Sequence, residues 1–334
     1  MIVRERSQPG RTAMARRQVA MSILATAFLT ACGGGQSPTE SAAPATTLGS
    51  SALPTATDPV ASASQQQSAV TTPAILAETF SLDDGRELFL RCAGEGSPTI
   101  ILEAGGQDDS DTWGPTDGRP FFGQLQQLSR TCAYDRANLG RSDPAPGPRF
   151  AQDSADDLAA LLAAAAVPGP YLLVGSSWGG IILAAYAADH PEDVDGIVLL
   201  DAAYPSTEPG MDATQANLPP EEWAAIVAAE KWDNPQNYEH VDIRASIDPI
   251  AAKMDRIPDV PITAVTATLA SDCPPSWPCE EILRDEAVLQ AQWAELSPHG
   301  RQVFVATGHV TYVEDPEAIV NIIADTLEAV RSTQ

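Results

Sequence analysis

From about residue 75 onward, the sequence alternates short apolar runs with longer stretches in which apolar residues recur at helical spacing. The short runs predict strands and the longer stretches predict helices. The predicted strands cover residues 76–81, 86–92, 98–103, 131–135, 170–174, 196–201, 262–267 and 302–306. The predicted helices cover residues 121–128, 153–166, 178–190, 280–296 and 316–331.

The order of these elements favours an α/β fold. The sequence LDDGRE joins the first two predicted strands, and its Asp-Gly pair is a hairpin signal. From the third strand onward strands and helices alternate, which is typical of a mostly parallel sheet covered on both faces. The alternation pauses at residues 202–260, where PPEEWAAIVAAEKW and DPIAAKM are helical in pattern. We therefore expect one domain over residues 75–334 with a small helical lid after the sixth strand.

The first 31 residues have a different pattern. Five arginines precede the apolar run VAMSILATAFLTA, which ends at Cys32. A basic start, a short apolar core and small residues before a cleavage point are typical of an export signal, and the run is short for a membrane span. The sequence LTAC resembles a bacterial lipobox, in which Cys32 would carry lipid and anchor the protein to a membrane. An ordinary secretory peptide with an incidental cysteine is the alternative.

Residues 32–74 follow as a low-complexity segment. They consist almost entirely of Gly, Ser, Ala, Thr, Pro and Gln, without aromatic residues or apolar periodicity. Such a composition cannot bury enough apolar surface to fold and behaves as a loose coil. We expect a disordered tether between the anchor and the folded body.

The charge of the chain restricts its partners. The formal net charge is −26, and removal of residues 1–31, with five Arg and one Glu, takes it to −30. A strongly acidic body does not present the basic groove that nucleic acids require, and it repels anionic substrates on approach.

Cysteines suggest two cross-links. If Cys32 carries lipid, four of the five cysteines remain, and disulfides persist in exported proteins. The sequence CPPSWPC can close on itself between Cys273 and Cys279, while Cys92 and Cys132 fall in two predicted strands. A zinc site is disfavoured because these cysteines have no histidine at ligand spacing.

The segment YLLVGSSWGGIILAAYA carries the strongest chemical signal. It reads as a buried strand, a tight turn and a helix, with Ser177 at the centre of a G-x-S-x-G motif. The flanking glycines permit a turn too tight for side chains, and the following helix N-terminus favours developing negative charge. A turn that only packs a helix on a strand is the alternative, but the strand-turn-helix context favours a nucleophilic serine.

A serine nucleophile needs a base, and the chain has four histidines. His190 lies at a helix end, His240 in the lid and His299 in a polar turn, where each has an ordinary structural explanation. His309 lies in a loop next to Gly308, after the last predicted strand and before the terminal helix. From there its ring can reach back across the sheet edge, so we expect His309 to be the base.

Two carboxylates compete for the third position. Asp272 ends the seventh predicted strand in PITAVTATLASD, and Asp201 ends the sixth in GIVLLDAAYP. We favour Asp272 and keep Asp201 as the alternative. The carboxylate would hold the His309 ring in the right tautomer and stabilise it when protonated.

Acyl transfer also requires donors for an oxyanion, usually two backbone N–H groups. The residue after the nucleophile, Trp178, supplies one. The loop ILEAGGQDD after the third strand supplies the other, which we assign to Gly106 with Gln107 as the near alternative.

These motifs together resemble the α/β-hydrolase superfamily, in its serine esterase and proline iminopeptidase-like branch, from about residue 75 to residue 330. LEAGG, YDRANLGRSD, GSSWGG, LLDAAYP and GHVTYVEDPE occur in the family's order, as do the serine, the acid and the histidine. Ala104 and Ser176 depart from the family, because many members carry histidine at these positions. The resemblance implies an eight-stranded, mostly parallel sheet in which Cys92 and Cys132 fall on adjacent strands and can pair.

We therefore expect a serine hydrolase that cleaves small to medium uncharged carboxylic esters through an acyl-enzyme intermediate, without metal or organic cofactor. Serine argues against the epoxide hydrolases and haloalkane dehalogenases of this fold, which attack with aspartate. A proline iminopeptidase-like aminopeptidase and a catalytically silent binding lipoprotein are the alternatives. The sequence predicts export to the cell envelope or secretion, and it leaves the acyl chain length and the oligomeric state open.

Overall fold

A computed structural model describes residues 75–114, 121–205, 218–271 and 273–333 of the chain. The predicted signal peptide (1–31), the predicted tether (32–74) with Cys32, and the candidate acid Asp272 lie outside the described residues.

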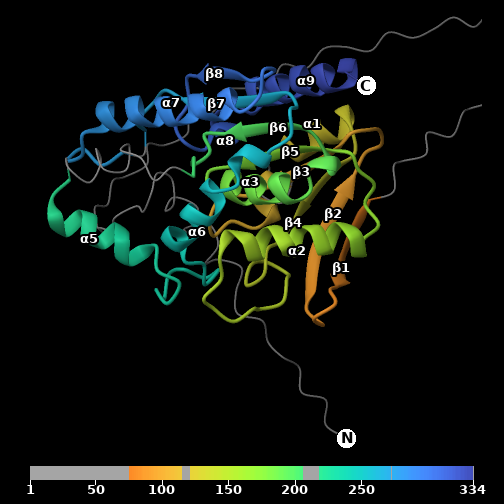
Figure 1. Ribbon diagram of the computed structural model, residues 1–334, viewed down its shortest axis with the longest axis horizontal. Helices are drawn as coiled ribbons and strands as arrows, with labels where there is room; N and C mark the ends of the chain where they lie inside the picture. Colours follow the sequence, from red (N-terminus) through yellow and green to blue (C-terminus); the bar gives the residue numbers. More distant parts are fainter. Residues whose placement is uncertain (1–74, 115–120, 206–217, 272, 334) are drawn as a thin grey trace, which may run out of the picture. The chain divides into compact units, whose positions relative to one another are not determined.

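Eight strands form one sheet in the order β1-β2-β4-β3-β5-β6-β7-β8 (Figure 1). The first two strands are antiparallel to each other, β2 is antiparallel to β4, and the remaining neighbours are parallel. All eight predicted strands are present, each within two residues of its predicted ends. Their bounds are β1 Leu76–Ser81, β2 Glu87–Ala93, β3 Thr99–Glu103, β4 Thr131–Tyr134, β5 Tyr171–Ser176, β6 Val194–Leu200, β7 Ile262–Ala267 and β8 Arg301–Val305.

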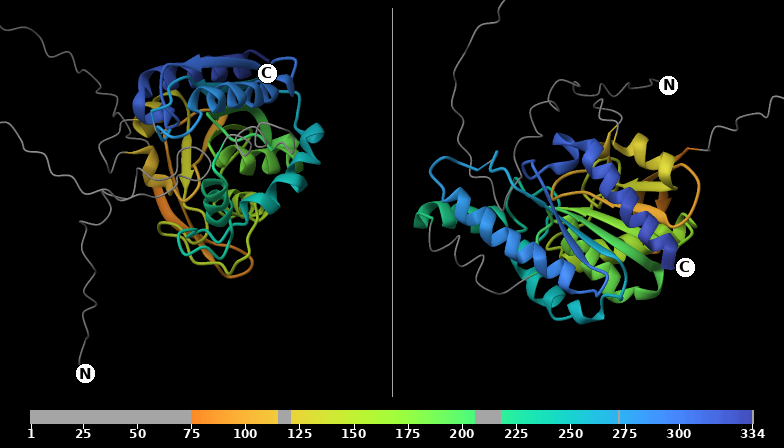
Figure 2. Two further views of the ribbon diagram at one scale, coloured as in Figure 1. Left: turned by 90° about the vertical axis from the view of Figure 1, so that its left-hand side faces the viewer. Right: turned by 90° about the horizontal axis from the view of Figure 1, so that it is seen from above.

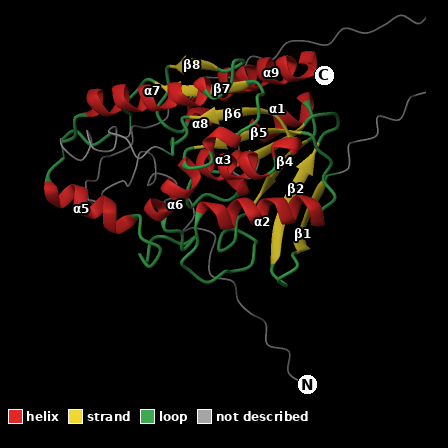
Figure 3. Cartoon of the chain, in the orientation of Figure 1, coloured by secondary structure: helices red, strands yellow, loops and turns green. Residues whose placement is uncertain are grey.

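Helices cover both faces of this sheet (Figures 1 and 3). One apolar cluster contains Leu158 of α2 and Ile181 of α3, and a second contains Phe121 of α1 and Ile323 of α9. Strands β3, β4, β5 and β7 are buried along their whole length between these layers, which explains their nearly continuous apolar sequences. The helix bounds are α1 Phe121–Leu128, α2 Ala151–Ala164, α3 Gly179–Asp189, α7 Cys279–Glu295, α8 Thr311–Glu314 and α9 Pro316–Thr333.

Short 3₁₀ helices complete the regular structure of the described residues, at Ser110–Trp113, Pro191–Asp193 and Met254–Arg256. In the part of the chain that the structure describes, no helix combines the length and the apolar character needed to cross a membrane.

The segment between β6 and β7 contains helices α5 (Pro220–Ala229) and α6 (Ile243–Ala251). Ile226 of α5 packs in one apolar cluster with Trp277 and Ile282, and the Trp277 indole donates a hydrogen bond to Glu222. The lid helix α5 is therefore fastened to the beginning of α7, next to which it lies in Figure 2. Helix α6 begins five residues before the predicted DPIAAKM segment, because Asp242 caps it through the N–H of Ala245 at 3.0 Å.

Both predicted disulfides are present. Cys92 of β2 and Cys132 of β4 are register partners on adjacent antiparallel strands, and they are bonded. Cys273 and Cys279 close the loop that leads into α7. The second bridge lies in the same apolar cluster that holds α5, so it stiffens the base of the lid.

Candidate active site

Ser177 lies in the turn between β5 and α3, with a φ of 52°. A side chain at either flanking glycine would collide with the fold. A Cβ on Gly175 would lie 2.8 Å from Leu183 Cδ1, and one on Gly179 would lie 2.6 Å from the carbonyl oxygen of Glu103. The glycines therefore let β5 and α3 meet closely enough to hold Ser177 in a left-handed conformation that a non-glycine residue adopts only under constraint.

The turn is tied to the end of the neighbouring strand β6. The Ser177 N–H donates to the Leu200 carbonyl at 3.2 Å, and the Ala203 N–H donates to the Ser177 carbonyl at 3.1 Å. Asp201 lies between Leu200 and Ala203 in the sequence, is buried, and has a φ of 44°. Two strained residues thus lie side by side at the carboxyl ends of adjacent strands.

His309, in the loop between β8 and α8, meets Asp201 at this edge of the sheet. The distance between His309 Nδ1 and Asp201 Oδ2 is 2.7 Å. The other carboxylate oxygen accepts the N–H of Ala267 at 2.9 Å and the side-chain amide of Gln290 at 2.7 Å. The carboxylate is therefore held from β7 and α7 while it faces the imidazole.

In the structure, His309 therefore contacts Asp201, the alternative acid. Asp272, which the sequence favoured, lies outside the described residues, and the carboxylate on His309 Nδ1 belongs to Asp201. The positive φ at Asp201 and the hydrogen bonds of Ser177 to Leu200 and Ala203 keep this carboxylate beside the Ser177 turn. His240 lies elsewhere, in the lid, and His190 packs on Tyr186 with ring centroids 4.9 Å apart.

Two α7 residues that the sequence did not indicate interact with this centre, one through a hydrogen bond and one through its charge. Gln290 is buried and accepts the Thr266 hydroxyl at 2.9 Å while it donates to Asp201. Glu286 lies four residues earlier, so it shares a helix face with Gln290. Burial and the negative charge of Asp201 raise the pKa of Glu286 to about 8, against the opposite effect of His309. Glu286 is therefore mostly protonated at neutral pH.

The loop after β3 lies against the nucleophile turn. A Cβ built on Gly105 would be 3.6 Å from Ser177 Cβ. The loop turns sharply, with the Asp108 N–H on the Gly105 carbonyl at 3.3 Å and a φ of 65° at Gln107. Gly106 lies in this turn, and Trp178 is the N-cap of α3, where N–H groups have no partner within the helix. The Gln107 N–H, the alternative oxyanion donor, is bonded to the carboxylate of Glu239.

A buried arginine lies beneath this loop. Arg136 donates to Glu103 Oε1 at 2.6 Å, to the Ala104 carbonyl at 2.9 Å and to the Gly105 carbonyl at 2.6 Å. Glu103 also accepts the Tyr134 hydroxyl. Burial raises the pKa of Glu103 to about 7, although Arg136 acts in the opposite direction.

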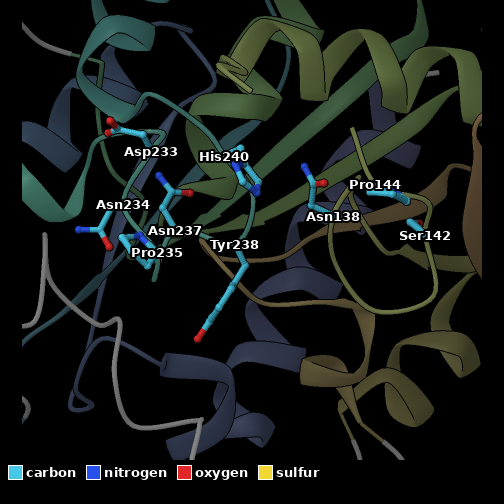
Figure 4. Close-up of a pocket in the computed structure, with 9 residues that line it drawn as sticks. All are labelled: Asn138, Ser142, Pro144, Asp233, Asn234, Pro235, Asn237, Tyr238 and His240. Carbon is cyan, nitrogen blue, oxygen red and sulfur yellow. The ribbon is translucent and has the colours of Figure 1, made fainter. Parts of the chain in front are cut away.

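A cavity of about 420 Å³ lies between the lid and the loop after β4 (Figure 4). Its lining residues do not include Ser177, Asp201 or His309. In Figure 4 the Tyr238 side chain extends away from the other labelled residues. The cavity is lined by Asn138, Ser142, Pro144, Asp233, Asn234, Pro235, Asn237, Tyr238 and His240.

Comparison with known proteins agrees with this architecture. A protein family described as alpha/beta hydrolase fold matches residues 61–234, about half of the chain. The uncharacterized protein YqjL of Bacillus subtilis is 36% identical over 110 residues, which make up 33% of this chain and 42% of YqjL. The chain spans between 16% and 42% of the length of the first curated relatives it matches.

Two solved structures share the fold at low sequence identity. The enol-lactonase from Burkholderia xenovorans LB400 is 19% identical with a TM-score of 0.54, over 75% of this chain and all of the lactonase. A thermophilic esterase from Thermogutta terrifontis is 21% identical with a TM-score of 0.50, over 76% of this chain and 99% of the esterase.

Proposed function

Because the chain belongs to the alpha/beta hydrolase fold family, we propose that it is a serine hydrolase that cleaves carboxylic esters through an acyl-enzyme intermediate. The observation that carries this proposal is the 2.7 Å contact between His309 and Asp201, next to the strained Ser177 turn. Ser177 is the nucleophile, His309 the base and Asp201 the acid. Asp201 takes the place that the sequence assigned to Asp272.

The proposed reaction follows from this order of groups. Asp201 accepts the Nδ1–H of His309, which leaves Nε2 as the atom that removes the proton from Ser177. The serine oxygen attacks the ester carbonyl, and the N–H groups of Gly106 and Trp178 stabilise the oxyanion. His309 then returns the proton to the departing alcohol. Water repeats the sequence on the acyl-enzyme and releases the carboxylic acid.

The substrate is a small to medium, uncharged ester. Two structural neighbours are described as an enol-lactonase and an esterase, which supports attack on a carboxylic ester carbonyl. The net charge of −26 repels anionic esters on approach. No nucleic acid or cofactor takes part.

The test is labelling of the full chain by a fluorophosphonate, combined with hydrolysis of p-nitrophenyl esters of increasing acyl length. Wild type should be labelled and should turn over esters, while Ser177→Ala should lose both activities. Ser176→Ala removes the neighbouring hydroxyl of β5 and should keep them.

Two outcomes would contradict the proposal. An unlabelled wild type would favour a catalytically silent binding protein. Faster cleavage of aminoacyl amides than of esters would favour an aminopeptidase of the proline iminopeptidase type.

A further inference from the structure

Glu239 is a buried carboxylate of the lid that has no part in the proposed triad. It lies between α5 and α6 and is 2% exposed. Its Oε2 accepts the Nε–H of Arg136 at 2.7 Å, and its Oε1 accepts an Nη2–H of Arg136 at 2.9 Å. The same Oε1 accepts the backbone N–H of Gln107. A single lid carboxylate therefore binds both the loop after β3 and the arginine beneath it.

The contact with Gln107 is reinforced by the two residues before Glu239. The Gln107 side chain donates to Asn237 Oδ1 at 3.0 Å and accepts the Tyr238 N–H at 2.6 Å. Gln107 has a φ of 65°, a conformation that persists in a non-glycine residue only where the surroundings fix it. Residues 237–239 supply that constraint.

Arg136 carries the effect of Glu239 to the Gly106 N–H. The Gly105 carbonyl and the Gly106 N–H belong to one planar peptide group and point in opposite directions. Arg136 Nη2 binds that carbonyl at 2.6 Å, so it fixes the direction of the Gly106 N–H. Arg136 in turn lies between two carboxylates, Glu103 on β3 and Glu239 on the lid.

We propose that Glu239 is a positioning residue of the oxyanion loop, which aims the Gly106 N–H at the developing oxyanion by holding Arg136 and Gln107. This inference rests on the proposed function, because it requires Gly106 to be an oxyanion donor. Glu239 is not itself a catalytic residue, since it acts through these two partners. The lid segment 237–239 is thereby a part of the catalytic apparatus and not only a cover.

The chain offers a matched control for a purely structural role. Glu230, at the C-cap of α5, is also a buried lid carboxylate, 4% exposed, and is paired with Arg244. Glu230 pairs with Arg244 through its side chain and bonds to Ile226 and Ile243 through its backbone, and none of these three residues belongs to the oxyanion loop. Loss of either carboxylate should lower thermal stability, but only loss of Glu239 should disturb the oxyanion donor.

The experiment compares wild type, Glu239→Ala, Glu239→Gln, Glu230→Ala and Glu230→Gln as full-length proteins. It measures the melting temperature, kcat and KM on a short p-nitrophenyl ester, and the rate constant of fluorophosphonate labelling at Ser177. Oxyanion contacts strengthen in the transition state, so Glu239→Ala should lower kcat by ~10²-fold with KM within about threefold of wild type. Glu239→Gln keeps an acceptor for the Gln107 N–H, so its kcat should fall less than that of Glu239→Ala.

Labelling should slow in parallel with kcat in the Glu239 variants, and the Glu230 variants should keep both rates. The proposal is overturned if Glu239→Ala and Glu239→Gln match the Glu230 variants in kcat and labelling rate. Should Glu239→Ala fail to fold, the nearly isosteric Glu239→Gln decides the question. Labelling of Ser177 in wild type tests the proposed function independently, so the two failures are distinguishable.

Discussion

Backbone strain at single residues marks the site of this protein. Six of the described non-glycine residues have positive φ, and three of them, Ser177, Asp201 and Gln107, belong to different loops at one edge of the sheet. Strained residues of this kind persist where packing and hydrogen bonds over-determine them, and they cluster at functional sites. In this chain each is fixed by contacts from a neighbouring element, so the site is built before substrate arrives.

The role of Asp201 is testable by a single substitution. Asp201→Asn preserves the shape of the side chain, but its amide can donate to His309 Nδ1 and so favours the wrong tautomer. We expect kcat for a short ester to fall by something approaching ~10⁴-fold, with an unchanged far-UV circular dichroism spectrum. Residues that act as one unit are not additive, so addition of Asp201→Asn to Ser177→Ala should lower the residual rate little further.

Asp272→Asn is the control for this prediction, because Asp272 is the other candidate acid and follows β7 in the sequence. It should retain nearly wild-type kcat. If Asp272→Asn lowers kcat strongly and Asp201→Asn does not, the acid of the triad is Asp272. The contact between Asp201 and His309 is then not needed for catalysis.

Glu286 provides a prediction about stability and pH. Its pKa of about 8 in the folded protein exceeds the ordinary value of 4.5, so the folded state binds a proton that the unfolded chain has lost. The contribution of Glu286 to the free energy of unfolding is therefore highest below pH 4.5 and is lost as pH rises through about 8. Glu286→Gln removes this dependence. It should be more stable than wild type at pH 9, by on the order of 5 kcal/mol, and the gap should narrow toward pH 5.

Melting temperatures from pH 5 to pH 9 measure this effect. Glu281→Gln, which replaces an exposed carboxylate on the same helix, should follow the wild-type curve. Parallel curves for wild type and Glu286→Gln would show that the Glu286 carboxyl is already ionised at neutral pH.

At the scale of elements, the close contact between α3 and the loop after β3 depends on one missing side chain. A Cβ on Gly179 would lie 2.6 Å and 2.7 Å from the carbonyl oxygens of Glu103 and Ala104. Backbone cannot yield as a flexible side chain can, so Gly179→Ala should destabilise the protein by about 2–3 kcal/mol in urea unfolding. It should also lower esterase activity, because α3 carries Trp178 at its start.

Gly123→Ala is the matched control in helix α1. The nearest atom to its built Cβ is Gln126 Nε2 at 3.9 Å, so the methyl group has room. Alanine is favoured over glycine inside helices, and the variant should be stabilised by about 0.5–1 kcal/mol. If Gly179→Ala and Gly123→Ala unfold at the same urea concentration, the explanation that a Cβ at Gly179 collides with backbone is wrong.

The elements themselves were largely predictable from the sequence. Strands buried on both faces give continuous apolar runs, and Tyr171–Ser176 and Ile262–Ala267 are of this kind. The start of α6 was missed because residues 243–247 have a mixed pattern and only the cap at Asp242 marks the beginning. Apolar runs in the sequence thus located the strands of the sheet well, whereas the sequence pattern in the lid predicted its helix boundaries less well.

The site was predictable to the extent that it follows from local motifs. Ser177 and His309 were assigned from a strand-turn-helix motif and from a position after the last strand. The sequence favoured Asp272 over Asp201, whereas His309 contacts Asp201; the local pattern does not separate the two, because both aspartates follow parallel strands that end at the same edge. Gln290 and Glu239 were missed for a related reason: their roles depend on where α7 and the lid pack, which no short motif specifies.

At the scale of the whole molecule, the main proposal is export and attachment to a membrane surface through lipid on Cys32. The basic, apolar segment before LTAC and the low-complexity residues 33–74 support it. The residues that carry it lie outside the described part of the chain. A tether of this composition would let the catalytic body act on substrates at a distance from the membrane.

Substitution of the lipidation site tests this proposal. Each buried CH₂ of an acyl chain adds ~0.8 kcal/mol to membrane affinity, and two or more chains give stable attachment. Wild type expressed in a bacterial host should therefore sediment with membranes and enter the detergent phase on partitioning, whereas Cys32→Ser should not be lipidated and should lose both properties. Ser177→Ala, inactive but unchanged at Cys32, should remain with the membranes.

The specific activity of any Cys32→Ser protein recovered in soluble form should equal that of wild type, because Cys32 precedes the folded domain by more than forty residues. A wild type that is as soluble as Cys32→Ser would mean that the segment is an ordinary secretory signal and Cys32 an incidental cysteine.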